Sequence, residues 1–116
     1  MNNKSDQRLF PRVKLKEPLH YRTRGVSDYN YTLLEDISLG GLAFLNSRYM
    51  PPQTQLTMEI KLLSKVLRPI GKVVWTSPVS HSDRFKTGIS FIEFDDNEKK
   101  FLSEYITMKT HQEQGA

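Results

Sequence analysis

The sequence contains no cysteine and no long hydrophobic run. The absence of cysteine excludes disulfides, thiolate metal sites and cysteine nucleophiles together. No apolar segment approaches the roughly 18 residues that a membrane-spanning helix needs, and the N-terminal sequence MNNKSDQRLF lacks the hydrophobic stretch of a signal peptide. From these absences we expect a soluble, cytoplasmic protein. Its 116 residues are the length of a single domain with a modest core.

The sequence also contains few residue patterns that are typical of enzymes. The three histidines, His20, His81 and His111, are far apart, and no two have the i, i+4 spacing of a helical metal site. The segment SHSD, residues 80–83, contains a serine, a histidine and an aspartate, but neighbours along one segment point apart and do not form a catalytic triad. A phosphate-binding loop of the type GxxxxGK(S/T) is missing. The sequence therefore predicts neither an enzyme nor a metal or cofactor site.

What the sequence does contain is an uneven distribution of charge. Residues 1–24 hold seven basic and two acidic side chains, a net charge of +5, whereas the rest of the chain carries −1 and the whole chain +4. Such a basic segment is suited to binding phosphate or another anion, although a solvated arm has the same composition. Residues 1–7 have no apolar anchor, and we expect them to form a flexible arm.

Alternating apolar residues mark most of the chain as β-structure. In segment 55–63 apolar residues occupy every second position, which is the period of a half-buried strand. In segment 29–37 the same spacing places Tyr29, Tyr31 and Leu33 on one face. Turn signals separate the segments, and six short strands in succession predict an antiparallel barrel or sandwich. The six segments are 13–21, 29–37, 41–46, 55–63, 67–76 and 85–94.

The apolar period changes near residue 95. Asp95 or Asp96 is suited to cap a helix, and Glu98 lies three positions after Asp95, as in a capping box. Apolar residues at helical spacing follow, and their expected role is to cover the barrel. The expected boundaries are a helix over about 95–109, a folded domain over 8–110 and a disordered tail over 111–116.

The turn sequence EDISLGG, residues 35–41, connects the second and third predicted strands. Asp and Ser bond nearby backbone groups in turns and Gly supplies positive φ, so a tight turn explains the motif without a ligand. The same residues are also suited to a ligand site. Asp36 could accept the paired N–H donors of a guanine edge, Ser38 could offer its hydroxyl, and outward-pointing amides could form an anion nest. Gly41 would let a ligand approach the backbone where a Cβ would collide.

Arg8 and Arg12, in the segment RLFPR, form a second candidate site. Guanidinium groups grip phosphate bidentately and stack on purine faces. Together, RLFPR and DISLGG resemble the two signature motifs of the PilZ domain family, RxxxR and (D/N)xSxxG, in the same order. The segments GKVVW, 71–75, and TGISF, 87–91, resemble the family's later strands. The resemblance extends from about residue 7 to about residue 108.

The resemblance implies an all-β fold, a six-stranded antiparallel β-barrel with a C-terminal α-helix, that binds the bacterial second messenger cyclic di-GMP. Arg8 and Arg12 would hold phosphates and the Hoogsteen edge or face of a guanine, and Asp36 would accept from guanine N1 and N2. Many members carry arginine where this chain has Gln7, so the number of bound ligands stays open. The implied ligand-binding residues are Arg8, Arg12, Asp36, Ser38, Gly40 and Gly41, with Gln7 and Trp75 as secondary candidates.

Three hypotheses about function follow. The leading one is a receptor in which cyclic di-GMP draws the N-terminal arm onto the barrel and a partner protein reads the changed surface; motility and biofilm formation are among the processes it would regulate. The second is a small nucleic-acid-binding barrel, since the chain is basic and Tyr21, Tyr29 and Tyr31 lie near the basic segment. The third is a protein-interaction module that has lost its ligand, against which the intact DISLGG motif argues.

Overall fold

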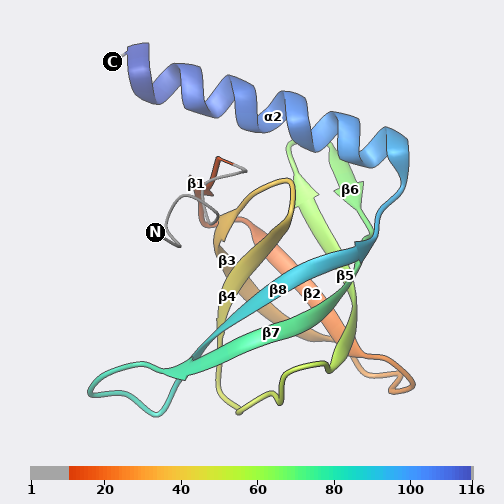
Figure 1. Ribbon diagram of the computed structural model, residues 1–116, viewed down its shortest axis with the longest axis vertical. Coiled ribbons are helices and arrows are strands. Elements are labelled where there is room, and N and C mark those ends of the chain that lie inside the picture. Colours follow the sequence, from red (N-terminus) through yellow and green to blue (C-terminus); the bar gives the residue numbers. More distant parts are fainter. Residues whose placement is uncertain (1–10, 116) are drawn as a thin grey trace, which may run out of the picture.

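The computed structural model describes the backbone of residues 11–115 and the side chains of residues 11–112 (Figure 1). Over this range the chain forms eight strands and one helix. In chain order they are β1 (Val13–Lys14), β2 (Pro18–Thr23), β3 (Asn30–Ile37), β4 (Gly41–Asn46), β5 (Gln55–Leu62), β6 (Lys65–Leu67), β7 (Ile70–Pro78), β8 (Phe85–Glu93) and α2 (Asp96–Gly115).

Six of the strands close into the predicted antiparallel barrel. Their order is β3-β2-β5-β7-β8-β4, and the pairing of β4 with β3 completes the circle. Two short strands lie outside it, since β1 pairs with β3 and β6 pairs with β5. The predicted first strand is thus divided in two, and β2 begins at Pro18, a position where proline is tolerated. The turn of the β5–β6 hairpin does not contain the usual Asn-Gly pair. Leu63 adopts the positive φ, 56°, that such a turn requires.

The interior of the barrel forms the core. The alternation in β5 is confirmed, because Leu56, Met58, Ile60 and Leu62 are fully buried.

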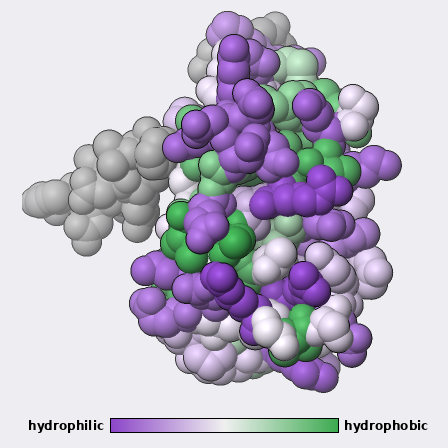
Figure 2. All heavy atoms as spheres, turned by 90° about the vertical axis from the view of Figure 1, so that its right-hand side faces the viewer, coloured by the Kyte–Doolittle hydropathy of each residue, from purple (hydrophilic) through white to green (hydrophobic). Residues whose placement is uncertain are grey.

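On the face that Figure 2 shows, hydrophilic residues predominate and interrupt the apolar groups, so this side carries no broad apolar patch.

Tyr31 and Leu33 share one face of β3, as predicted, and this face is exposed. Tyr31 and Leu33 are 72% and 48% exposed, whereas Leu34 and Ile37 are fully buried. The register between β3 and β4 shifts between Leu34 and Asp36, which marks a β-bulge. A bulge adds one residue to a strand, so residues three positions apart can both point inward.

The helix begins as predicted. Asp95 Oδ2 accepts a hydrogen bond from the Glu98 amide at 3.1 Å, and the Asp95 carbonyl accepts from the Lys99 amide at 2.8 Å. The Glu98 side chain does not complete a capping box, because its Oε1 accepts from the Arg68 amide at 2.7 Å. This contact ties the start of α2 to the loop between β6 and β7. The helix then crosses one end of the barrel (Figure 1) and covers the core with Leu102, Tyr105 and Ile106.

The helix is longer than predicted. Its expected end is near residue 109, but α2 continues to Gly115, so residues 111–115 are helical rather than a disordered tail. The apolar stripe ends before this segment, and the sequence THQEQ contains no proline or glycine. Extending an existing helix adds one hydrogen bond for each residue ordered, so a helix can continue beyond its apolar stripe. No helix in the described part of the chain is long and apolar enough to cross a membrane.

Candidate functional site

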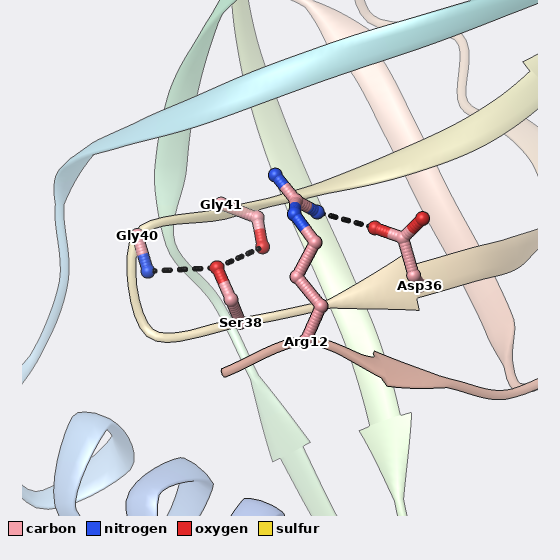
Figure 3. A network of polar contacts seen from close by, with 5 residues as sticks. All are labelled: Arg12, Asp36, Ser38, Gly40 and Gly41. Carbon is pink, nitrogen blue, oxygen red and sulfur yellow. Dashed lines mark hydrogen bonds and ion pairs between the residues drawn. The ribbon is translucent and has the colours of Figure 1, made fainter. Parts of the chain in front are cut away.

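Arg12 and Asp36 contact each other although they come from the two separate sequence motifs. β1 pairs with β3 in the register Val13↔Ile37, which lays the residue preceding β1 alongside the end of β3. Arg12 Nη1 donates to Asp36 Oδ1 (Figure 3). The Arg12 side chain is 47% exposed and that of Asp36 is 14% exposed, so the pair faces solvent from one side. The structure thus joins one predicted residue of each motif.

Asp36 begins a row of paired residues across four strands. Asp36 pairs with Ala43 of β4, Ala43 pairs with Gly88 of β8, and Gly88 pairs with Trp75 of β7. Directly paired residues of antiparallel strands project toward the same face. A Cβ at Gly88 would lie 2.2 Å from Cε2 of Trp75, so the indole rests against the Gly88 backbone. Ala43 therefore forms a floor between the Asp36 carboxylate and the Trp75 indole, and Gly88 leaves room for the indole.

A β-bulge turns Trp75 toward this floor. Simple alternation would place Trp75 on the same face as Val73, which is fully buried. The β7–β8 register shifts between Val73 and Trp75, and Trp75 is 41% exposed. Bulges often redirect a side chain next to a functional site. The secondary candidate Trp75 is thereby placed on the same surface as Arg12 and Asp36.

A hollow of about 380 Å³ lies over the floor, and Arg12, Asp36, Ala43, Trp75 and Lys86 line it. The volume falls within the range of roughly 300–1,000 Å³ that is usual for small-molecule sites. Arg12 contacts Asp36, whereas Lys86 forms no ion pair with another described residue. Two cations, a carboxylate and an indole suit a ligand that combines anionic groups, N–H donors and a flat ring.

The side chain of Ser38 is engaged inside the turn. Its Oγ accepts from the Gly40 amide at 3.2 Å and donates to the Gly41 carbonyl at 3.4 Å (Figure 3). The Ser38 amide also donates to the Gly41 carbonyl, at 2.8 Å, and the residue is 4% exposed. The amides of Ser38 and Gly40 therefore point into the turn rather than outward, so these two do not form the expected anion nest.

Gly41 is required by packing between strands. A Cβ at this position would lie 1.9 Å from the Ile89 carbonyl oxygen on the paired strand β8. Among the described glycines only Gly25 has a positive φ, so conformational freedom does not explain Gly41. The residue is small because β8 lies against it, which differs from the expected approach of a ligand. Ligand contacts of Ser38, Gly40 and Gly41 stay predictions, and none of the three lines the hollow.

Sequence reasoning missed Ala43 and Lys86, which line the hollow, and Gly88, which leaves room for the indole. Alternation along β8 would have placed Lys86 on the same face as Gly88. The sequence does not show, however, which strand lies beside β8. Two predicted residues, Gln7 and Arg8, lie outside the described residues.

The three histidines lie on separate segments of the structure. His20 lies on β2, His81 in the loop between β7 and β8, and His111 on α2. His20 Nδ1 is 4.0 Å from Glu59 Oε1 on the neighbouring strand β5. No group of three side chains suited to hold a metal ion occurs among the residues that the structure describes.

Comparison with known proteins yields one family and several solved structures. The PilZ domain family matches residues 6–108. The PilZ domain of YcgR from Escherichia coli, solved with c-di-GMP, is 13% identical with a TM-score of 0.70, and the match covers 94% of this chain and 95% of that one. The Bacillus subtilis inhibitor of motility MotI/DgrA is 15% identical with a TM-score of 0.80, over 90% of this chain and 51% of that one. PlzA of Borreliella burgdorferi, in complex with c-di-GMP, is 17% identical with a TM-score of 0.65, over 89% and 42%.

These matches differ in what they establish. No curated protein matches the chain. At such low identities the solved structures show the fold alone, and the chain spans about half the length of the inhibitor of motility. The family match is broader, since it runs from the RLFPR motif through the barrel and into α2. With its barrel, its two motifs and this match over residues 6–108, the chain belongs to the PilZ domain family.

Proposed function

We propose that this protein is a receptor for cyclic di-GMP and that it binds the ligand in the hollow over Ala43. The observation that carries the proposal is the paired row that sets the Asp36 carboxylate and the Trp75 indole on either side of Ala43 in one hollow. Membership in the PilZ family supports it, as do structural neighbours solved in complex with c-di-GMP, among them YcgR and PlzA.

Each polar or aromatic residue of the hollow has a distinct proposed role. Asp36 accepts hydrogen bonds from N1 and N2 of a guanine, because an ionised carboxylate presents two acceptor oxygens side by side. The Trp75 indole stacks on a guanine face. Arg12 directs part of its guanidinium fork to a phosphate, since its five N–H donors exceed what one carboxylate uses. Lys86 attracts a phosphate as a compact charge.

The arm that precedes the described residues supplies the remaining proposed contacts. We infer that Arg8 holds a further phosphate or guanine, as the RxxxR motif implies. Binding would then order the arm beside the hollow, and a partner protein would read the altered surface. On this proposal the protein acts in the cytoplasm and performs no catalytic step.

Calorimetric titration with cyclic di-GMP tests the proposal, with Trp75→Ala as the informative variant. Removing a stacked aromatic costs about 1–3 kcal/mol per base, so we expect the dissociation constant to rise roughly 5- to 150-fold. Tyr31→Ala is the matched control, because Tyr31 is an exposed aromatic on β3 that does not line the hollow. The control should bind like the wild type.

Two outcomes would reject the proposed site. The wild type should gain about 2.7 kcal/mol of stability when the ligand is present at 100 times its dissociation constant, so no thermal shift at millimolar cyclic di-GMP contradicts the receptor role. Equal affinities of Trp75→Ala and wild type would place the ligand elsewhere. Retention on single-stranded DNA that weakens steeply with salt, without any response to cyclic di-GMP, would instead support the nucleic-acid-binding alternative.

Lys86→Ala is expected to weaken binding of cyclic di-GMP about tenfold, because a hydrogen-bonded charge is lost but partial exposure to solvent reduces its contribution. The affinity of the variant should also depend less on salt, since fewer exposed charges attract the phosphates. Titrations at low and high salt measure both effects. Lys61→Ala, an exposed lysine of β5, is the control and should match the wild type at both salt concentrations. An unchanged affinity and salt dependence in Lys86→Ala would exclude the phosphate contact.

A further inference from the structure

The two ends of the barrel are closed differently. Helix α2 covers one end with apolar side chains that join the core. At the other end the inward-facing positions become polar, since Tyr21 is followed by Thr23 on β2 and Phe44 by Asn46 on β4. The loop between β4 and β5 passes below this end (Figure 1). The end of the barrel opposite to the helix is therefore polar, and we call it the barrel mouth.

A hollow of about 350 Å³ occupies the mouth. A water molecule takes about 30 Å³ in the liquid, so the space suits an organic molecule rather than one trapped water. Barrel mouths are also among the usual places for small-molecule sites. The residues that line it include Tyr21, Thr23, Asn46, Arg48, Tyr49 and Thr54, and none of its lining residues belongs to the hollow of Arg12 and Asp36.

The walls of the mouth are held by hydrogen bonds. Thr87 Oγ1 donates to Asn46 Oδ1 at 2.7 Å, and Asn46 Nδ2 donates to the Arg48 carbonyl. Both Asn46 and Thr87 are buried, so this polar pair fixes the backbone that carries Arg48. Further along the loop, Thr76 Oγ1 donates to the Met50 carbonyl at 2.7 Å. A site whose walls are already ordered loses little conformational entropy when it binds.

The charge in the mouth favours anions. Arg48 is the one charged residue among those that line it, and it forms no ion pair with another described residue. Burial raises the pKa of the Tyr21 phenol, and the positive charge of Arg48 partly opposes this rise. Tyr49 stands at the rim, with its ring edge-on to Phe85 at a centroid distance of 6.1 Å. The mouth thus combines one guanidinium, neutral hydroxyl and amide groups, and two aromatic rings.

We propose that the barrel mouth is a second ligand site, separate from the proposed nucleotide site, which binds a small organic anion. The carboxylate or phosphate group of the ligand pairs with Arg48, whose planar fork matches either group bidentately. The body of the ligand lies between Tyr21 and Tyr49. The proposal does not depend on binding of cyclic di-GMP, because the two sites share no residue.

Amide-resolved NMR titration of the full chain tests the proposal, with benzoate, phenyl phosphate and the uncharged benzamide as probes. We expect saturable shifts of the amides of residues 46–50, 53 and 54 and of Tyr21 and Thr23 with benzoate or phenyl phosphate, and none with benzamide. A stronger response to one anion identifies whether a carboxylate or a phosphate is preferred. The experiment contains no cyclic di-GMP, so its failure leaves the receptor proposal standing.

Arg48→Gln and Arg48→Ala supply the decisive comparison. Both should weaken binding of the anionic probe at least about tenfold, because a charge-assisted hydrogen bond is lost. Arg84→Ala is the control, an exposed arginine in the loop between β7 and β8 that does not line the mouth. The absence of saturable shifts at tens of millimolar probe, equal binding of benzamide, or wild-type affinity in the Arg48 variants would each overturn the proposal.

Discussion

Asp36→Ala is expected to reduce the affinity for cyclic di-GMP at least about 100-fold while the barrel stays folded. The variant removes an acceptor of two charge-assisted hydrogen bonds from guanine, each worth about 1.5–3 kcal/mol. The fold should survive because the Arg12 partner is 47% exposed, so its charge stays in contact with water when the carboxylate is removed. Calorimetry measures the first effect and thermal unfolding the second.

A double-mutant cycle separates the role of Arg12 from that of Asp36. The two side chains contact each other, so the losses caused by Arg12→Ala and Asp36→Ala should not be additive. Asp83→Ala, an exposed acidic residue outside the hollow, is the matched control for the removal of a negative charge. Wild-type affinity in Asp36→Ala would contradict the assignment of Asp36 as the guanine acceptor.

Gly41→Ala is expected to destabilise the protein by about 3 kcal/mol or more. Its Cβ would meet the Ile89 carbonyl oxygen at 1.9 Å, the carbonyl carbon at 3.0 Å and Ser90 Cα at 3.2 Å. All three atoms belong to the backbone of β8, so relief requires two paired strands of the closed barrel to separate. Overpacking that side chains can relieve costs about 1–3 kcal/mol, and a backbone clash should reach or exceed the upper limit. Thermal unfolding should show a melting temperature lower by roughly 10 °C.

Gly25→Asn is the matched control for this prediction. Gly25 has a φ of 88° but no atom within 4 Å of an added Cβ, and asparagine tolerates left-handed backbone better than most residues. Its loss of stability should therefore be about 1 kcal/mol or less. If Gly41→Ala kept its melting temperature but lost binding of cyclic di-GMP, the packing explanation would be wrong and the expected approach of a ligand to Gly41 would be supported.

The elements that the sequence predicts well are those set by local spacing. Every second residue of β5 is apolar, and all four of these residues are fully buried. Asp95 caps α2 because a carboxylate three positions before an amide reaches it within one turn. The six-stranded barrel follows from counting such segments, together with the resemblance to the PilZ family.

Features that depend on contacts between distant segments are harder to predict from the sequence. The bulge near Glu35 lets Leu34 and Ile37 both point into the core, and the bulge near Val74 exposes Trp75. A shift of one residue moves every later side chain to the opposite face, and only pairing with another strand determines where it occurs. The end of α2 was missed for a different reason, since an apolar stripe shows where a helix packs rather than where it stops.

Local spacing, together with the two PilZ-like motifs, was enough to predict a small barrel covered by a C-terminal helix and to mark Arg12 and Asp36 as suited to phosphate and guanine. Spacing and side-chain chemistry are local properties, so they can be read along the chain. The folded arrangement was needed to show that Trp75 and Lys86 complete the hollow, that Gly41 packs against Ile89, and that Arg48 lines a polar barrel mouth. Each of these depends on strand register and on loops fixed by remote partners, which the order of residues does not reveal.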